Sequence, residues 1–170
     1  MKLIDNFHLF LLQIHRSSFL LSLCVLNILF CFLISILFSE IGESDVAKIN
    51  YLEEESLTNI FLFTVIIAPF LETFLFQFLI IETVLFIFNK FRISHSIYFA
   101  IAISSLAFGL SHSYNLYYVL FTLLAGVLYA SFYLLAKKRH DLNGYLTVVL
   151  IHACTNFFGF ILMDVLKLNL

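Results

Sequence analysis

Five long apolar runs dominate this sequence and restrict it to structures that a lipid bilayer can hold. They cover residues 17–38, a stretch within 58–88, 95–110 or slightly beyond, 117–136 and 145–166. A helix needs roughly 20 apolar residues to cross the hydrocarbon core. Backbone polar groups inside a bilayer must be satisfied within the segment, so such runs form helices. The sequence therefore predicts an all-α, polytopic transmembrane helical bundle of about five spans.

The composition agrees with this prediction, because 62% of the residues are hydrophobic and only 12% are charged. Soluble globular domains carry about 25% charged residues, so an ordinary soluble domain is excluded. The chain has no glycine-rich phosphate loop, and nothing in it supports nucleic-acid binding. The expected environment is the lipid bilayer.

The second run contains the only proline of the chain, Pro69. At about 31 residues, this run would extend for ~46 Å as one helix, which is too long for an upright span. Proline suits the first turn of a helix and disrupts an interior. We therefore expect a separate or interfacial short helix over 58–68 and a true span that starts at Pro69, with Glu72 in its first turn.

Basic residues in the short loops predict the orientation, since Lys and Arg prefer the cytoplasmic side. Two bases flank the first run near the N-terminus, two lie at 90–92 and three lie at 137–139, whereas the alternate loops and the C-terminus hold one, none and one. This pattern predicts a cytoplasmic N-terminus, in what we expect to be a bacterial inner membrane. Residues 1–57 would form an N-terminal span with an acidic extracytoplasmic loop, and residues 58–170 a catalytic core.

Glu72, His112, His152 and Asn156 are the polar side chains that stand out in or at the edge of these runs. An ionisable group inside a membrane is costly unless it faces a cavity and has a function. His152 and Asn156 are four residues apart, as are Phe108 and His112, so each pair shares one helix face. The sequence thus predicts a functional site in a cavity between helices.

These residues fall into three motifs, which are Glu72-Thr73 with Gln77, Phe108-Gly-Leu-Ser-His112, and His152-Ala-Cys-Thr-Asn156. Their order resembles the CPBP family of intramembrane proteases, also called the Abi family, which includes the CAAX proteases and bacteriocin-processing enzymes. The family pattern is Glu-Glu-xxx-Arg, then Phe-xxx-His, then His-xxx-Asn or Asp. The resemblance covers roughly the last two thirds of the chain.

The first motif departs from that pattern, because Thr73 stands in place of the second Glu and Gln77 in place of the Arg. These two positions are four residues apart, so the family's residues could form an ion pair within the helix. We expect Thr73 and Gln77 to replace it with a neutral hydrogen bond. Together with Phe108 they would support the site.

The resemblance implies an intramembrane endopeptidase without a covalent intermediate. Glu72, assisted by His112, would activate a water molecule as a general base. His152 and Asn156 would donate hydrogen bonds to the oxyanion. The substrate would be a membrane-associated peptide or protein, such as a prenylated CaaX tail, a bacteriocin leader or a membrane-anchored peptide.

Two alternatives remain open at this point. No cofactor is favoured, but Glu72, His112 and His152 form a donor set that zinc accepts, so a zinc-dependent metalloprotease is the first alternative. The second is a non-catalytic immunity or chaperone-like membrane protein, in which the same residues form a binding pocket. The change at Thr73 and Gln77 is its best support.

The depth of the site also remains open. The proposed topology puts Glu72 and His112 near the outer face, whereas His152 lies ~12 Å from the inner end of its helix. Elsewhere, Glu82 is expected to be structural, and Gly126 and Ala130 form a small face for close helix packing. Asp164 is assigned no role.

Overall fold

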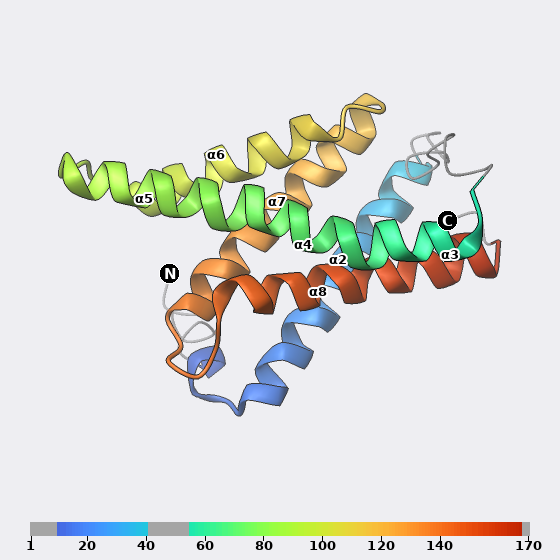
Figure 1. Cartoon of the computed structure of the whole chain (residues 1–170), viewed down its shortest axis with the longest axis horizontal. Coiled ribbons are helices and arrows are strands. Elements are labelled where there is room, and N and C mark those ends of the chain that lie inside the picture. The colour runs from blue at the N-terminus through green and yellow to red at the C-terminus, as the bar shows by residue number, and fades with distance from the viewer. Residues whose placement is uncertain (1–9, 41–54, 168–170) are drawn as a thin grey trace.

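A computed structural model describes residues 10–40 and 55–167, and all regular secondary structure in these residues is helical (Figure 1). The elements are α2 (Arg16–Glu40), α3 (Leu57–Ile60), η2 (Phe61–Ile67), α4 (Ala68–Glu72), η3 (Thr73–Ile80), α5 (Ile81–Lys90), α6 (Ser96–Ser111), α7 (Leu116–Lys137), α8 (Gly144–Phe160) and η4 (Ile161–Val165). The elements labelled η are π-helical. Most of the predicted acidic loop lies outside the described residues.

Four helical stretches are long and apolar enough to cross a membrane, and a fifth helix is shorter. The four are Arg16–Leu37, Leu57–Lys90, Leu116–Lys137 and Gly144–Val165, and the shorter one is Ser96–Ser111. At 1.5 Å per residue, the 16 residues of α6 extend for about 24 Å. The five helices coincide with the five apolar runs, so the prediction of a polytopic helical membrane protein is confirmed.

The expected break at Pro69 is wrong. One continuous helical stretch runs through Leu57–Lys90 over 34 residues, here called the long helix. Pro69 is buried near the start of α4, directly after the π-helical η2. Proline in an α-helix clashes with the carbonyl four residues earlier, and the wider π-helical turn relieves that clash without ending the helix. Glu72 therefore lies near the middle of the long helix, not in a first turn.

Two antiparallel pairs of helices build the bundle. The long helix runs alongside α8, with Phe61 packed edge-on against Phe157 and Phe160 (Figure 1). Helix α6 turns back into α7, and glycines let these two approach closely. A Cβ atom on Gly109 would lie 2.8 Å from the Leu123 Cβ, and one on Gly126 would lie 3.1 Å from the Ser105 Cα. The small face predicted around Gly126 is therefore a helix contact.

Glu82 has the structural role expected for it. Its carboxylate accepts hydrogen bonds from the Tyr133 hydroxyl at 2.6 Å and from the Lys137 ammonium at 2.5 and 2.7 Å. These contacts join the long helix to the C-terminal end of α7. A carboxylate held in this way is already satisfied, which separates Glu82 from Glu72, ten residues earlier.

Arg139, in the loop between α7 and α8, connects that loop to the N-terminal segment. Its guanidinium donates to the backbone carbonyls of Leu11 and Ile14 at 3.1 and 2.9 Å and lies 4.8 Å from the centre of the Phe19 ring. It also forms an ion pair with Asp141 at 2.8 Å. Hydrogen bonding to Arg139 holds the pKa of the exposed Asp141 carboxyl below its ordinary value.

Candidate active site

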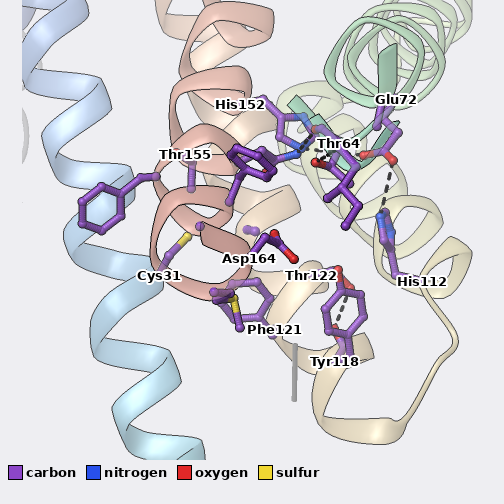
Figure 2. A pocket seen from close by; sticks show the side chains of 18 of the residues that line it. Cys31, Thr64, Glu72, His112, Tyr118, Phe121, Thr122, His152, Thr155 and Asp164 are labelled. Carbon is purple, nitrogen blue, oxygen red and sulfur yellow. Dashed lines mark hydrogen bonds and ion pairs between the residues drawn. The ribbon is translucent and has the colours of Figure 1, made fainter. Parts of the chain in front are cut away.

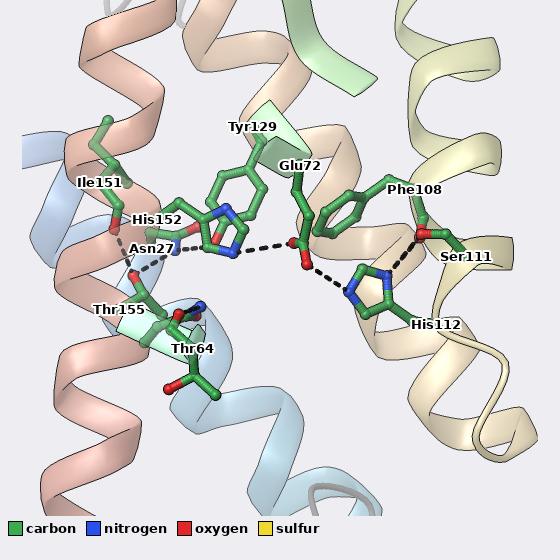
Figure 3. A network of polar contacts seen from close by, with 11 residues as sticks. Asn27, Thr64, Glu72, Phe108, Ser111, His112, Tyr129, Ile151, His152 and Thr155 are labelled. Atoms are coloured by element: carbon green, nitrogen blue, oxygen red, sulfur yellow. Dashed lines mark hydrogen bonds and ion pairs between the residues drawn. The ribbon is translucent and has the colours of Figure 1, made fainter. Parts of the chain in front are cut away.

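The Glu72 carboxylate lies between two imidazoles that come from different helices (Figure 3). Its Oε1 is 3.6 Å from the His112 Nε2, and its Oε2 is 3.7 Å from the His152 Nε2. These distances are ion-pair contacts, slightly longer than a direct hydrogen bond. The structure therefore brings three of the four predicted catalytic side chains to one point.

The lengths of the helices explain how side chains at such different places in the sequence meet. Glu72 ends α4 near the middle of the long helix, and His112 caps the short helix α6, just before the turn into α7. His152 follows the start of the antiparallel helix α8 by eight residues. The mismatch in depth inferred from the sequence disappears, because it assumed that Glu72 opens a new span.

The surroundings of His112 fix where one of its protons lies. Its Nδ1 is 2.7 Å from the Phe108 carbonyl oxygen, which can only accept a hydrogen bond. The Nδ1 atom therefore carries a hydrogen and the Nε2 atom faces Glu72.

His152 is more deeply buried and is held mainly by aromatic rings. Its side chain is 5% exposed, and its Nδ1 has no hydrogen-bond partner in the described part of the chain. A buried N–H without an acceptor is rarer than an unpaired acceptor, so we place the hydrogen on Nε2, toward Glu72. The Tyr129 ring stacks on the imidazole, with centroids 4.6 Å apart and planes inclined by 30°.

Phe108, the predicted supporting residue, lies where these groups meet. It is 2% exposed, and its ring centroid is 4.6 Å from that of His112 and 6.0 Å from that of His152. Its carbonyl also orients the His112 ring. One phenylalanine thus contacts both imidazoles and sets the tautomer of one of them.

Asn156 is anchored to the long helix by a bond that Pro69 makes available. The Asn156 Nδ2 donates to the Thr64 carbonyl at 2.8 Å. In the π-helical register the Ala68 N–H donates to Phe63, and the next residue, Pro69, has no N–H to offer. The Thr64 carbonyl is thus left without a backbone donor, and the Asn156 amide takes that place.

The hydrogen bond predicted between Thr73 and Gln77 is wrong. Both side chains are fully buried, and none of their polar atoms has a hydrogen-bond partner among the described residues. The reason is local, because the π-helical η3 begins at Thr73. Its wider turn aligns residues five apart, so residues four apart no longer face each other.

A cavity of about 900 Å³ opens in front of the three ionisable groups (Figure 2). Helices α2, α6, α7 and α8 line it together with the long helix, and most of the lining side chains are apolar. Asn156, Tyr129 and Asp164 also line it. The volume lies in the usual range for ligand-binding sites. A peptide segment bound in this cavity would contact the apolar side chains that line it and also the Glu72 carboxylate.

Two residues of the site, Tyr129 and Asn27, were not recognised from the sequence. Asn27 donates to the Tyr129 hydroxyl at 3.4 Å and to the Thr155 hydroxyl at 2.8 Å. An amide in the middle of the first apolar run is a signal that could have drawn attention to Asn27. Tyr129 had no such signal, since tyrosine is ordinary in an apolar helix.

Glu72, His112 and His152 are the residues that would hold a zinc ion. Zinc accepts one carboxylate and two imidazoles when all three converge on one ion at about 2.0–2.2 Å. In this structure each imidazole faces a different oxygen of Glu72. Within residues 10–40 and 55–167 no group of three His, Cys, Asp or Glu side chains is arranged to hold a metal ion.

Comparison with known proteins gives one result, a match to a family model. The model of the type II CAAX prenyl endopeptidase Rce1-like family matches residues 54–158, which is 105 of the 170 residues. The matched segment contains Glu72, His112, His152 and Asn156, and it leaves out α2. No curated protein and no solved structure matches the chain.

Proposed function

We propose that this chain, which belongs to the type II CAAX prenyl endopeptidase Rce1-like family, hydrolyses peptide bonds in the membrane with a water molecule activated by Glu72. Membership of the family makes it a membrane protease in general terms. The residues that act, the way they act and the substrate are the content of the proposal.

The position of Glu72 carries the proposal. A carboxylate on an apolar helix normally has a structural partner, as the partly exposed Glu82 has in Lys137. Glu72 instead faces a cavity, with one imidazole on each side of it. Ionisable groups are placed this way in membranes where they do chemistry.

Glu72 and His112 would act together on the attacking water. As the water oxygen bonds to the scissile carbonyl carbon, one of its protons passes to the Glu72–His112 pair. The carbonyl oxygen then carries the negative charge. When the C–N bond breaks, the pair returns a proton to the leaving amine, so that one water and one peptide give a carboxylic acid and an amine.

His152 and Asn156 would stabilise the oxyanion. The His152 Nε2 lies 3.7 Å from the Glu72 Oε2 in a residue that lines the cavity, and Asn156 keeps a second amide N–H beyond the one bound to Thr64. Preorganised donors of this kind stabilise developing charge strongly in a site of low polarity. The anchor on Thr64 supports this role, because it limits rotation of the amide.

The apolar cavity favours a membrane-associated peptide or protein as the substrate, and no metal is required by this scheme. We further propose that the protein lies in a bacterial cell membrane with its N-terminus in the cytoplasm, which rests on the basic loops alone. The metalloprotease and the non-catalytic binding protein are the outcomes against which the proposal is tested.

The test is cleavage of a library of membrane peptides by the purified full chain, wild type against Glu72→Gln. This change keeps the shape and removes the base, so kcat should fall by about 10²–10⁴-fold. Glu82→Gln is the matched control, because it alters a glutamate of the same helix whose partners are structural, and it should leave kcat near the wild-type value.

Equal cleavage by wild type and Glu72→Gln would contradict the assignment of Glu72. A wild-type protein that binds peptides without cleaving any of them, and that loses binding in His112→Ala, would instead establish the non-catalytic pocket.

A further inference from the structure

Helix α2 faces outward along most of its length, except for a buried face formed by Phe19, Leu23 and Asn27. Its large side chains Leu21, Leu33 and Leu37 are 66%, 63% and 53% exposed, and only 11% of the residues in its most apolar stretch are buried. Asn27, in the middle of this helix, is fully buried. A polar side chain in such a helix is expected to have a specific partner.

Asn27 contacts α8, the helix that carries His152, and α7, the helix whose Tyr129 packs against the imidazole (Figure 3). Its amide donates to Thr155, three residues beyond His152 on α8, at 2.8 Å. The Thr155 hydroxyl in turn donates to the Ile151 carbonyl, directly before His152, at 3.0 Å. The same amide donates to the Tyr129 hydroxyl at 3.4 Å, and the Tyr129 ring stacks on the imidazole.

His152 itself lacks the anchor that a functional histidine usually has. A catalytic or ligating histidine is generally oriented by a hydrogen bond on its second nitrogen. The His152 Nδ1 is buried without a partner among the described residues. Its ring orientation therefore depends on the Glu72 contact at Nε2 and on the rings packed against it, of which Tyr129 at 4.6 Å lies nearer than Phe108 at 6.0 Å.

We propose that Asn27 is a positioning residue, which orients His152 through the Tyr129 ring and through Thr155. This inference rests on the proposed function of His152 as an oxyanion donor. It extends the active site to α2, a helix outside the residues that the family model matches. The first helix is then a part of the catalytic unit and not only a membrane anchor.

The competing explanation is that Asn27 only holds α2 to the bundle. Amides do act as interhelical contacts in membranes. A purely structural contact would change stability and leave the turnover of the folded protein unchanged. Positioning predicts the reverse, a loss of turnover at nearly constant substrate affinity.

The experiment uses the full chain with Asn27→Leu, which keeps the size of the side chain and removes the donor. Misplacement of a reacting group by about 1 Å costs up to ~10²-fold in rate, so kcat should fall between about tenfold and 10²-fold with KM within twofold. Leu23→Ala is the matched control. It removes a buried α2 side chain, 1% exposed, one turn before Asn27.

A second readout makes the test independent of catalysis. Nitrogen NMR of the His152 imidazole, assigned with a His152→Gln variant, should show one tautomer in the wild type and shifted or broadened signals in Asn27→Leu. Tyr129→Phe keeps the stacked ring and removes its hydroxyl. Adding it to Asn27→Leu should cause little further loss, since both changes break the same contact.

The inference is overturned if Asn27→Leu and Leu23→Ala lose activity in parallel with stability, or if the His152 signals stay unchanged in Asn27→Leu. A wild type that cleaves no peptide would defeat the proposed function instead. In that case the NMR comparison still decides whether Asn27 orients His152.

Discussion

Replacing Pro69 by alanine should make the protein more stable and less active. Proline in a helix interior is about 3 kcal/mol less favourable than alanine. Because Pro69 has no N–H, the Thr64 carbonyl has no backbone donor in this structure and accepts a hydrogen bond from Asn156 instead. Alanine at position 69 supplies that N–H in the π-helical register. If the helix relaxes to the α-helical register, Ala68 supplies it instead, so Thr64 gains a backbone donor in either case.

The structure allows both magnitudes to be worked out. The gain from removing proline is at most about 3 kcal/mol, since the π-helical turn already relieves the clash, and the loss of the Asn156 hydrogen bond, worth about 1 kcal/mol, reduces it. The free energy of unfolding should therefore rise by at most about 2 kcal/mol. In Pro69→Ala the Asn156 side chain keeps its amide group, but the hydrogen bond that fixes the orientation of that group is lost. Turnover should therefore fall by up to the ~10²–10³-fold that removal of one oxyanion donor costs.

The assay combines thermal unfolding in detergent with steady-state cleavage of a peptide substrate for four proteins, which are the wild type, Pro69→Ala, Asn156→Ala and the double variant. Asn156→Ala should lower kcat by ~10²–10³-fold with little change in KM. If Pro69 acts through Asn156, the double variant should be no slower than Asn156→Ala alone. Full activity in Pro69→Ala, or losses that add in the double variant, would refute the reasoning.

Three further predictions concern metal dependence, membrane orientation and helix packing. Strong chelators should leave peptide cleavage unchanged, and stoichiometric zinc that is lost in parallel with activity would contradict this. Single cysteines in a background without the three native ones should be reactive from outside intact cells at Asn115 and protected at Lys90; the reverse pattern would invert the topology. Gly109→Ala should destabilise the protein by about 1–3 kcal/mol, because its Cβ would lie 2.8 Å from the Leu123 Cβ. Gly159→Ala, which meets nothing within 4 Å, is the control, and equal unfolding temperatures for the two variants would contradict the packing argument.

The helices of this fold could be predicted from the sequence because run length and hydrophobicity determine membrane spans. The five apolar runs became five helices with ends shifted by only a few residues. The pairing of Phe108 with His112 was also predictable, since it depends on spacing within one helix. Here the ring contact and the carbonyl that orients His112 follow from that spacing.

The interior of the long helix could not be predicted in the same way. The usual rule ends a helix at proline, but two π-helical segments carry the chain past Pro69 and change which side chains face each other. The expected contact between Thr73 and Gln77 failed for this reason. The placement of Asn27 beside Tyr129 depends on how three helices cross, which no local pattern contains.

The residues of the candidate active site come from helices that are synthesised one after another, and this order has a consequence for biosynthesis. Glu72 is made early, His112 follows, and His152 and Asn156 arrive only with α8, the last long helix. Arg139, which ties the N-terminal segment to the loop before α8, is also late. A nascent chain with α2, the long helix, α6 and α7 already inserted thus lacks both proposed oxyanion donors. In the proposed mechanism, hydrolytic competence would then begin only once α8 has joined the other helices.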